Sequence, residues 1–497
     1  MTRRLSMIFQ LLLLLCFPCR STYAMTWDSK RITAGIPGSD SILVGSCLNQ
    51  VAPDGEVRQP LSERLGPTPS TQDQAARESE FFTLAMPGIL DQHAFAEYRM
   101  WRKHLYGTIY GEKPPSDNPL LSTQAAVADY LNTVADFASP GGILIYWRSQ
   151  PEYRSASQLC VGLALSDRRM LVEASPVADA STLTSLLRFD RVSGARVAIP
   201  RSGPSEPRDR DAAKPMDLVA LSRALLPPTI AAALSARRVK SLLVVPIQAI
   251  GSVPFAALPL PSGGTVIDYS SVTMAPGISG LRFGGDATPR TITTTDAKLI
   301  IGDPDLTTNS TWIFPPLPGA RQEAQTVAGV FGERALIGRA ATRKAVVTRL
   351  TARPTPRLIY FATHAIADQV NPQDASFLAL TGANLRTREI GKLRLSGRPL
   401  VVLSACQTGL GKVFDEGGIF GMALAWHYAG AGAVVMSLWN VPDLPTRDLM
   451  TEFSRRLQTE TPSEALAGSM RMLKQRDSLP NHWAGFTVYG GLPHRSQ

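Results

Sequence analysis

Two stretches of sequence decide the fold: residues 357–365 read RLIYFATHA, and residues 399–409 read PLVVLSACQTG. Each stretch contains an almost unbroken run of apolar side chains and then reaches a reactive one, His364 in the first and Cys406 in the second. A short continuous apolar run is typical of a strand buried on both faces, as in a parallel sheet covered by helices. The two stretches therefore predict two core strands.

Similar apolar runs recur along the chain and are bounded by turn-forming residues. The predicted strands are 142–147, 242–245, 299–301, 358–361, 400–403 and 434–436. Residues 319–331 and 448–457 lie between or after these runs and place their apolar residues at helical spacing. Alternation of strands and helices over about 350 residues predicts an α/β fold, with a mainly parallel central sheet flanked by helices.

Composition excludes several classes of protein. The 497 residues are 44% hydrophobic and 19% charged, which is ordinary for a globular chain and unlike collagen-like, disordered or multi-span membrane proteins. The net charge of +10 is scattered, without a run of five or more Lys or Arg. We therefore expect no nucleic-acid partner.

Residues 1–24 have the order of a secretory signal peptide. Arg3 and Arg4 precede an apolar stretch, Leu5–Cys19, and small residues precede a cleavage position after Ala24. The apolar stretch is shorter than the roughly 20 residues that a membrane-spanning helix needs. We expect an exported protein, periplasmic or secreted, with no stable membrane span once the signal is removed.

The rest of the chain divides by composition into three parts. Residues 25–78 are loop-rich, with Pro and Gly punctuating a polar stretch. Residues 79–135 have a helical pattern with many aromatic residues, which fits a layer packed on the next domain or a surface for partner proteins. The strand-rich pattern occupies residues 136–497.

The reactive side chains are placed where open α/β sheets gather functional groups, at the carboxyl ends of strands. His364 and Cys406 lie 42 positions apart, with a predicted helix at 387–393 between them. If their strands are neighbours, the imidazole lies near the thiol, which is the arrangement that activates a cysteine nucleophile.

An ordered set of motifs carries a family resemblance. In chain order the motifs are 245–246, 254–259, 302–304, 317–320, 360–365 (YFATHA), 403–409 (LSACQTG), 417–421, 429–431, 437–443 (SLWNVPD) and 482–486. Together they resemble the CHAT family of caspase-like cysteine peptidases, relatives of separase and the gingipains. The resemblance implies a caspase-like domain over 136–497. Its first half, 136–295, would be of the pseudo-catalytic type, and 296–497 would carry the His and the Cys.

The resemblance also implies roles for single residues. Cys406 would be the nucleophile and His364 the general base. The backbone amides of Ala365 and Cys406 would stabilise the oxyanion. No metal or other cofactor is expected, and the partner would be a protein or peptide substrate.

Related peptidases favour a basic residue before the scissile bond, which directs attention to acidic residues near the dyad. Asp443 is the first candidate to line a pocket for Arg or Lys, because a carboxylate pairs well with a guanidinium group. Asp415 and Glu416 compete for this role, and Trp439 would help to line the pocket. The alternative for all three acids is that they are solvated loop acids or a helix N-terminal charge before Gly417.

The other cysteines and histidines are expected to be structural. Cys47 and Cys160 would pair or stay buried, leaving Cys406 as a thiol in an oxidising compartment. His427 and His482 fit packing or capping roles better than catalysis, and the same applies to His93 and His104. No cysteine lies at metal-ligand spacing.

Three functions remain open at this point. The first is an exported cysteine endopeptidase that cleaves after a basic residue. The second is a latent CHAT-type module that acts as a scaffold and recruits partners through 79–135. A general α/β hydrolase is a distant third, because the chain has no Gly-x-Ser-x-Gly motif.

Overall fold

The computed structural model describes most of the strand-rich part of the chain. The described residues are 23–28, 31–32, 141–149, 158–165, 169–175, 199–200, 216–236, 239–246, 248–275, 291–308, 311–368, 371–406, 408–409, 411–414 and 418–490. The predicted helical region 79–135 lies outside them. Of the predicted loop-rich segment 25–78, only 25–28 and 31–32 are described, and these residues lie in strands.

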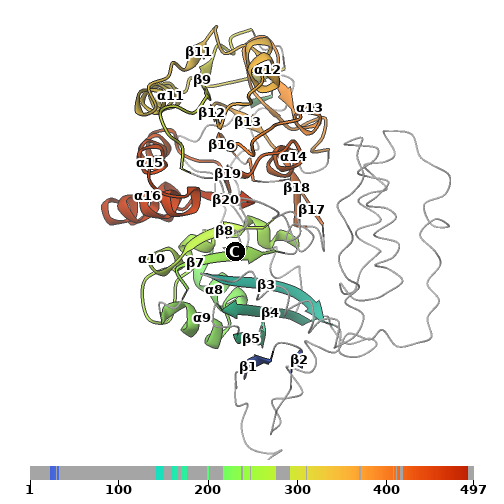
Figure 1. Ribbon diagram of the computed structural model, residues 1–497, viewed down its shortest axis with the longest axis vertical. Helices are drawn as coiled ribbons and strands as arrows, with labels where there is room; N and C mark the ends of the chain where they lie inside the picture. The colour runs from blue at the N-terminus through green and yellow to red at the C-terminus, as the bar shows by residue number, and fades with distance from the viewer. Residues whose placement is uncertain are drawn as a thin grey trace, which may run out of the picture.

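Thirteen of the described strands form one sheet (Figure 1). Their spatial order is β11 (Leu336–Gly338), β9 (Lys298–Pro304), β12 (Leu358–Ala362), β16 (Leu400–Ser404), β19 (Ala433–Ser437), β20 (Phe486–Gly490), β8 (Ser271–Met274), β7 (Ser241–Val245), β3 (Gly142–Ser149), β4 (Gln158–Leu165), β5 (Arg169–Ala174), β1 (Tyr23–Asp28) and β2 (Arg31–Ile32). All six predicted strands are present.

The strand directions divide the sheet into two halves. From β11 to β19 neighbouring strands are parallel. Strand β20 runs antiparallel to β19 and parallel to β8, and β8, β7 and β3 are again parallel to one another. We call the described residues before 276 the first half and those after 290 the second half. The predicted α/β class is confirmed, although the β3–β4–β5 edge is an antiparallel meander that was not predicted.

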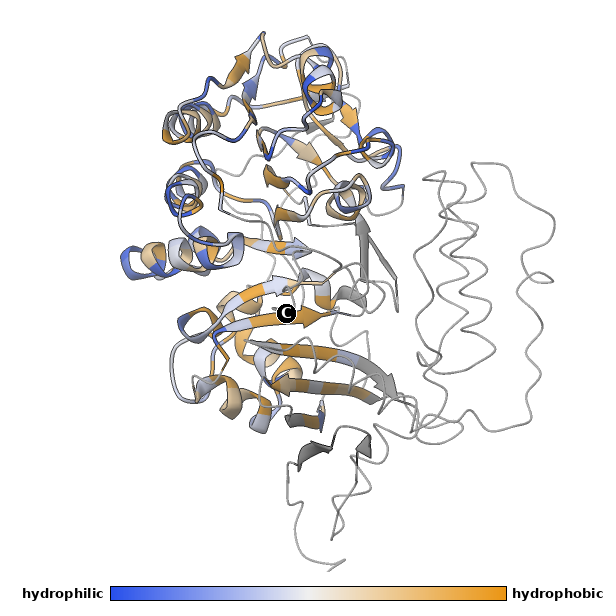
Figure 2. Cartoon of the chain, viewed as in Figure 1, coloured by the Kyte–Doolittle hydropathy of each residue, from blue (hydrophilic) through white to orange (hydrophobic). Residues whose placement is uncertain are grey.

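Helices cover both faces of the second half (Figure 1). One face carries α11 (Pro318–Val330), α15 (Asp443–Arg456), α16 (Pro462–Arg476) and α17 (Pro480–Trp483), and the other carries α12 (Arg343–Thr351), α13 (Thr387–Gly391) and α14 (Met422–Tyr428). Successive strand residues face opposite sides, so Tyr360 packs toward α11 and α15 while Phe361 packs toward α14. Hydrophilic residues lie mainly on the outer helices, and the strands are largely apolar (Figure 2).

The predicted amphipathic faces are also confirmed. Ala324, Val327, Ala328 and Phe331 of the first predicted helix are all buried. The second predicted helix, 448–457, corresponds to α15, which begins earlier, at Asp443, and ends at Arg456. In both helices the spacing of the apolar residues had located the face that packs on the sheet.

The first half has shorter helical elements. They are α8 (Leu218–Leu225), α9 (Pro228–Ser235), α10 (Val266–Tyr269), and the 3₁₀ turns η1 (Gln248–Ser252) and η2 (Phe255–Ala257). Among the described helices, none by itself is long and apolar enough to cross a bilayer. The α8–α9 pair meets these requirements of length and composition only when the two are taken together, and it bends by 101° between them.

Three small ladders lie outside the main sheet. They are β13 (Ala365–Ile366) with β14 (Phe377–Leu378) and β15 (Leu385–Arg386), β17 (Gly411–Phe414) with β18 (Gly418–Gly421), and β10 (Trp312–Ile313) with β6 (Ile199–Pro200). The first follows β12 and the second follows β16, so both lie close in sequence to the residues of interest. The third joins β10, which precedes α11, to β6 of the first half.

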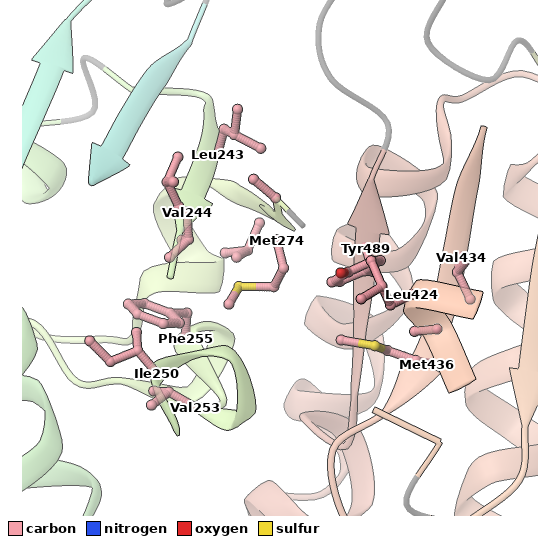
Figure 3. Close-up of a cluster of buried hydrophobic side chains, with 14 of the residues drawn as sticks. Leu243, Val244, Ile250, Val253, Phe255, Met274, Leu424, Val434, Met436 and Tyr489 are labelled. Atoms are coloured by element: carbon pink, nitrogen blue, oxygen red, sulfur yellow. The ribbon is translucent and has the colours of Figure 1, made fainter. Parts of the chain in front are cut away.

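The two halves join through β8 and β20, which share two register pairs, Thr273↔Val488 and Met274↔Tyr489. Apolar side chains meet across this junction (Figure 3). Met274 and Phe255 come from the first half, and Met436 and Leu424 come from the second. Burial of these side chains in one cluster packs the halves together.

Candidate active site

His364 and Cys406 follow two strands that are direct neighbours. Strands β12 and β16 are parallel, and their last register pair is Ala362↔Ser404. His364 and Cys406 each lie two residues beyond this pair. The ladder continues past it, since the Thr363 amide donates to the Ser404 carbonyl at 3.3 Å. Neighbouring strands are about 4.8 Å apart, so the two residues leave the same edge of the sheet at the same level.

The two side chains also belong to the same face of the sheet. Residues two apart in a strand point to the same side. Tyr360 and Val402 pack in the core beneath α11 and α15, and Cys406 belongs to that same cluster. On the same side His364 contacts the segment that precedes α11.

The His364 ring is oriented by a backbone carbonyl. Its Nε2 atom lies 2.8 Å from the Pro315 carbonyl oxygen, and the ring of Phe314 lies 5.1 Å away, centroid to centroid. Because a carbonyl oxygen only accepts hydrogen bonds, Nε2 must carry the proton in this contact. In the neutral ring Nδ1 is then the basic nitrogen.

Both side chains are closed off from solvent. His364 is 1% exposed and Cys406 is 2% exposed. Cys406 is a thiol and is not in a disulfide. In this conformation the arrangement contains a potential base and a potential nucleophile, but a peptide reaches them only after some movement of the surrounding chain.

The amide of Ala365 is directed by the small ladder after β12. The Ala379 amide donates to the His364 carbonyl at 2.9 Å, and Ala365 is in register with Leu378. In an antiparallel ladder this places Ala365 and Leu378 in a non-hydrogen-bonded pair. The Ala365 N–H therefore points away from β14.

The turn after β16 is fixed by hydrogen bonds to the end of β19. The Ser437 hydroxyl donates to the Ala405 carbonyl and accepts from the Thr408 amide, at 3.1 Å in the second case. The Ser437 amide donates to Thr408 Oγ1 at 2.9 Å, and the Gly409 amide donates to the Ser437 carbonyl at 2.8 Å. Any side chain at 409 would have its Cβ 2.8 Å from that carbonyl oxygen, so glycine is required.

Asp443 caps a helix. Its carboxylate accepts hydrogen bonds from the amides of Gly319, at 2.6 Å, and Ala320, at 3.1 Å, in the first turn of α11. A Cβ at 319 would lie 2.5 Å from Asp443 Oδ2, which explains the glycine there. A negative charge at a helix N-terminus is favourable. The role of Asp443 in a specificity pocket stays a prediction.

The structure describes only one of the other three residues suggested for the pocket, Trp439. Trp439 is buried and packs against Gly485, where an added Cβ would lie 3.1 Å from the indole Nε1. Asp415 and Glu416 lie outside the described residues. The pocket roles of all three stay predictions.

The two other histidines among the described residues make local contacts of their own. The His427 ring lies 6.3 Å from that of Tyr489, and burial, with a further contribution from the charge of Arg398, lowers its pKa to about 4. His482 pairs with Asp477 through Nδ1. These contacts fit the packing roles expected from sequence. His93 and His104 lie outside the described residues.

Cys160 is disulfide-bonded, and its partner lies outside the described residues. The proposed pairing of Cys160 with Cys47 stays a prediction, because Cys47 is also outside them.

Sequence reasoning missed three contributors to this region. They are the Pro315 carbonyl, the Ser437 hydroxyl and the amide of Gly319. A signal for the last was present, because a glycine directly after a proline at a helix start often marks a close approach. The motif SLWNVPD contained Ser437, but nothing local indicated which backbone atoms it would contact.

The family follows from a match over more than half of the chain. A family model described as the CHAT domain matches residues 217–491. The chain therefore belongs to the CHAT domain family. The sheet itself extends before residue 217, to β3, β4 and β5.

Curated relatives share part of this region. Tetratricopeptide repeat protein 28 of Mus musculus is 27% identical over 249 residues, which cover 41% of this chain and 10% of the relative. The Homo sapiens protein of the same name is 26% identical over 244 residues, with the same coverage. The chain thus spans about a tenth of the length of these relatives.

Two kinds of solved structure are similar to the chain. The Arg-specific cysteine proteinase gingipain R matches with a TM-score of 0.36 and 13% identity, over 54% of this chain and 68% of that one. The Saccharomyces cerevisiae separase–securin complex matches with a TM-score of 0.44 and 12% identity, over 83% of this chain and 34% of that one.

Proposed function

We propose that this protein is a cysteine endopeptidase with a His364–Cys406 dyad. The observation that supports the proposal most strongly is the register of β12 and β16, because it brings the imidazole-bearing and thiol-bearing residues to the same level on adjacent parallel strands. A thiol needs a nearby base to be a good nucleophile at neutral pH. Membership of the CHAT family is consistent with this chemistry.

The steps follow from the proton positions. With Nε2 protonated toward Pro315, Nδ1 of His364 takes the proton of the Cys406 thiol. The thiolate attacks the carbonyl carbon of the scissile peptide bond, and the negative charge moves to the carbonyl oxygen. The amides of Ala365 and Cys406 donate hydrogen bonds to that oxygen.

Collapse of this intermediate releases the amine, which receives its proton from His364. The product on the enzyme is a thioester at Cys406. His364 then takes a proton from water, whose oxygen attacks the thioester carbonyl. Release of the carboxylic acid restores the thiol, so protons and electrons balance over the cycle.

We propose that the substrate carries a basic residue before the scissile bond. Asp443, Asp415 and Glu416 are the candidates for the matching carboxylate. For Asp443 this role requires its carboxylate to serve a substrate as well as the amides of α11. Trp439 is the proposed apolar wall of the pocket.

The closed state of the dyad favours a second function. His364 and Cys406 are almost completely buried, which is what a latent protein, or one that acts as a scaffold, would show. In this reading the CHAT domain is an interaction module, and residues 79–135 recruit partners. The two functions differ in whether an opening step ever exposes Cys406.

Export remains part of the proposal. We propose that residues 1–24 direct secretion and that cleavage follows Ala24. Such cleavage would shorten β1, which begins at Tyr23, by two residues. Amino-terminal sequencing of the protein recovered from culture medium or periplasm tests this, and an intact Met1 would contradict it.

The deciding experiment is covalent labelling. The full chain is expressed with export, purified and treated with an acyloxymethyl ketone probe bearing Arg, and the modified residue is found by peptide mass mapping. We expect labelling at Cys406 in the unmodified protein and none in Cys406→Ala. His364→Ala should label at least a hundredfold more slowly.

His482→Ala is the matched control, because it removes an imidazole that pairs with Asp477 outside the dyad. It should label at the original rate. Labelling that persists in Cys406→Ala would contradict the mechanism. A folded protein that no Arg, Lys or Leu probe labels would favour the interaction module.

A further inference from the structure

We infer that Ser437 is a positioning residue for the proposed peptidase reaction: its hydroxyl aims the Cys406 amide at the oxyanion. The inference rests on the proposed function. It concerns a residue at the end of β19, on the strand next to β16, that has no role in proton transfer or nucleophilic attack. Its effect reaches the reacting atoms through one peptide unit.

The Ala405 carbonyl and the Cys406 N–H belong to the same planar group, and in a trans peptide they point in opposite directions. The Ser437 hydroxyl donates to the Ala405 carbonyl. Fixing the carbonyl on one side therefore fixes the direction of the Cys406 N–H on the other.

The hydroxyl is itself held in place. It accepts from the Thr408 amide at 3.1 Å, and the Ser437 amide donates to Thr408 Oγ1 at 2.9 Å. Ser437 and Thr408 are completely buried, so water does not compete for these bonds. Since the Ser437 Oγ bonds the residues on both sides of the Cys406–Gln407 pair, it closes the turn that carries the nucleophile.

The bond also strengthens the donor. A peptide carbonyl that accepts a hydrogen bond polarises its own N–H, which then donates more strongly. A donor that is already fixed needs no reorganisation when charge develops on the substrate oxygen. Ser437 thus contributes to both the direction and the strength of the Cys406 amide.

The second proposed donor is arranged in the same way. The His364 carbonyl accepts from the Ala379 amide at 2.9 Å, which directs the Ala365 N–H away from β14. Both donors are therefore oriented from behind, through the carbonyl of their own peptide unit. Only the contact at Ala405 uses a side chain, so only that contact can be removed by substitution.

The test compares two reagents on the full chain. A peptide aldehyde ending in Arg forms a tetrahedral adduct with the cysteine and needs the oxyanion donors, whereas alkylation by iodoacetamide needs only the thiolate. In Ser437→Ala we expect aldehyde inhibition 10- to 100-fold weaker and kcat lowered by a similar factor. KM should change less than twofold, and so should the rate of alkylation at each pH.

Ser469→Ala is the matched control. Ser469 is also a buried serine whose hydroxyl donates to a backbone carbonyl, that of Ala465 at 2.7 Å, but it lies in α16. It should leave aldehyde inhibition unchanged. Ser437→Cys supplies a graded variant in case Ser437→Ala does not fold, because a thiol is a weaker donor of nearly the same shape and should give intermediate inhibition.

The outcomes separate the two proposals. If the unmodified protein is not inhibited by the aldehyde, the proposed function fails and this inference fails with it. A second outcome is that the aldehyde inhibits the unmodified protein and inhibits Ser437→Cys just as strongly, together with Ser437→Ala if that variant folds. In that case Ser437 has no positioning role. A parallel loss of alkylation rate would also contradict it, because the thiolate itself would then be affected.

Discussion

The two halves of the sheet are built alike but lead into different residues. In the second half, β12 and β16 are adjacent parallel strands that lead into His364 and Cys406. In the first half, β7 and β8 are also adjacent parallel strands, and the residues two positions beyond their last register pair, Val244↔Met274, are Pro246 and Pro276. A proline side chain can neither transfer a proton nor attack a carbonyl. Both halves thus contain a pair of adjacent parallel strands, and the proposed site depends on the two side chains that follow the pair in the second half.

The halves also differ in direction. Strand β20 runs antiparallel to β19 and parallel to β8, so β8, β7 and β3 of the first half run opposite to β12 and β16. The carboxyl ends of these three strands lie at the other end of the sheet's strands from His364 and Cys406. The first half can support the site by packing across the junction (Figure 3), but the carboxyl ends of β8, β7 and β3 point away from it.

The largest expected difference between the halves is in activity. His364→Ala should lower kcat/KM for a fluorogenic Arg peptide by about a thousandfold, because general-base catalysis is removed. Pro246→Ala, at the corresponding strand end of the first half, should change kcat/KM less than twofold. Comparable losses in both variants would mean that the comparison between strand ends is wrong.

Acid should weaken the second half near its junction with the first. His427 contacts Tyr489, and its pKa of about 4 lies below the value near 6.5 of an unfolded chain. Between pH 6.5 and 4 the unfolded state binds more protons, so the free energy of unfolding falls as the pH falls through this window and is fully retained above it. The loss should approach about 3 kcal/mol.

Denaturant unfolding at pH 7 and pH 4.5 measures this effect. His427→Gln should flatten the pH dependence in that window, because glutamine does not titrate. If the free energy of unfolding of the variant falls equally steeply with pH, titratable groups other than His427 cause the loss.

In both halves, a methyl group added at a strand glycine that packs against a neighbouring side chain should lower the free energy of unfolding. A Cβ at Gly302 in β9 would lie within 3.0 Å of Ala324 Cβ, and one at Gly142 in β3 would lie 2.9 Å from Val239 Cγ1. We expect Gly302→Ala to cost about 2 kcal/mol of unfolding free energy, and Gly142→Ala somewhat less because the valine can rotate. Gly329→Ala, where a Cβ meets nothing within 4 Å, should stabilise α11 by about 0.5–1 kcal/mol.

A smaller effect than that of Gly302→Ala concerns the cap of α11 by Asp443, whose counterpart in the first half is the hydrogen bond from the Thr229 amide of α9 to the Glu173 carboxylate, at 3.2 Å. Asp443→Ala should cost about 1 kcal/mol, since two helix amides lose their acceptor. Asp443→Asn should cost less, because an amide oxygen still accepts. Thermal unfolding measures both, and the ratio of labelling by Arg and Leu probes tests the pocket role. An unchanged ratio in Asp443→Asn would limit Asp443 to capping.

The sequence predicted the positions of strands and helices well where the pattern of apolar residues is local. The strand runs and the buried faces of α11 and α15 were predicted because apolar periodicity reports burial directly. The start of α15 was predicted five residues late. Leu444 is exposed and Pro445 lies in the first turn, where a missing N–H is tolerated, so neither belongs to the apolar stripe.

The antiparallel edge of the first half was harder to predict from the sequence. Strands β4 and β5 read QLCVGLAL and RMLVEA, which contain apolar residues but give no indication of their partners. Pairing is a choice among many strands of similar composition. Only packing of the whole sheet selects one register.

By itself the sequence determined which residues could form buried strands and which two side chains could carry nucleophilic chemistry, because both depend on residue type and short-range order. The tertiary structure decided which atoms meet. The Pro315 carbonyl reaches His364 across 49 positions, Ser437 reaches Ala405 across 32, and Asp443 reaches Gly319 across 124. Contacts of this kind form only when β12, β16, β19 and the helices pack together, so no local pattern in the chain can contain them.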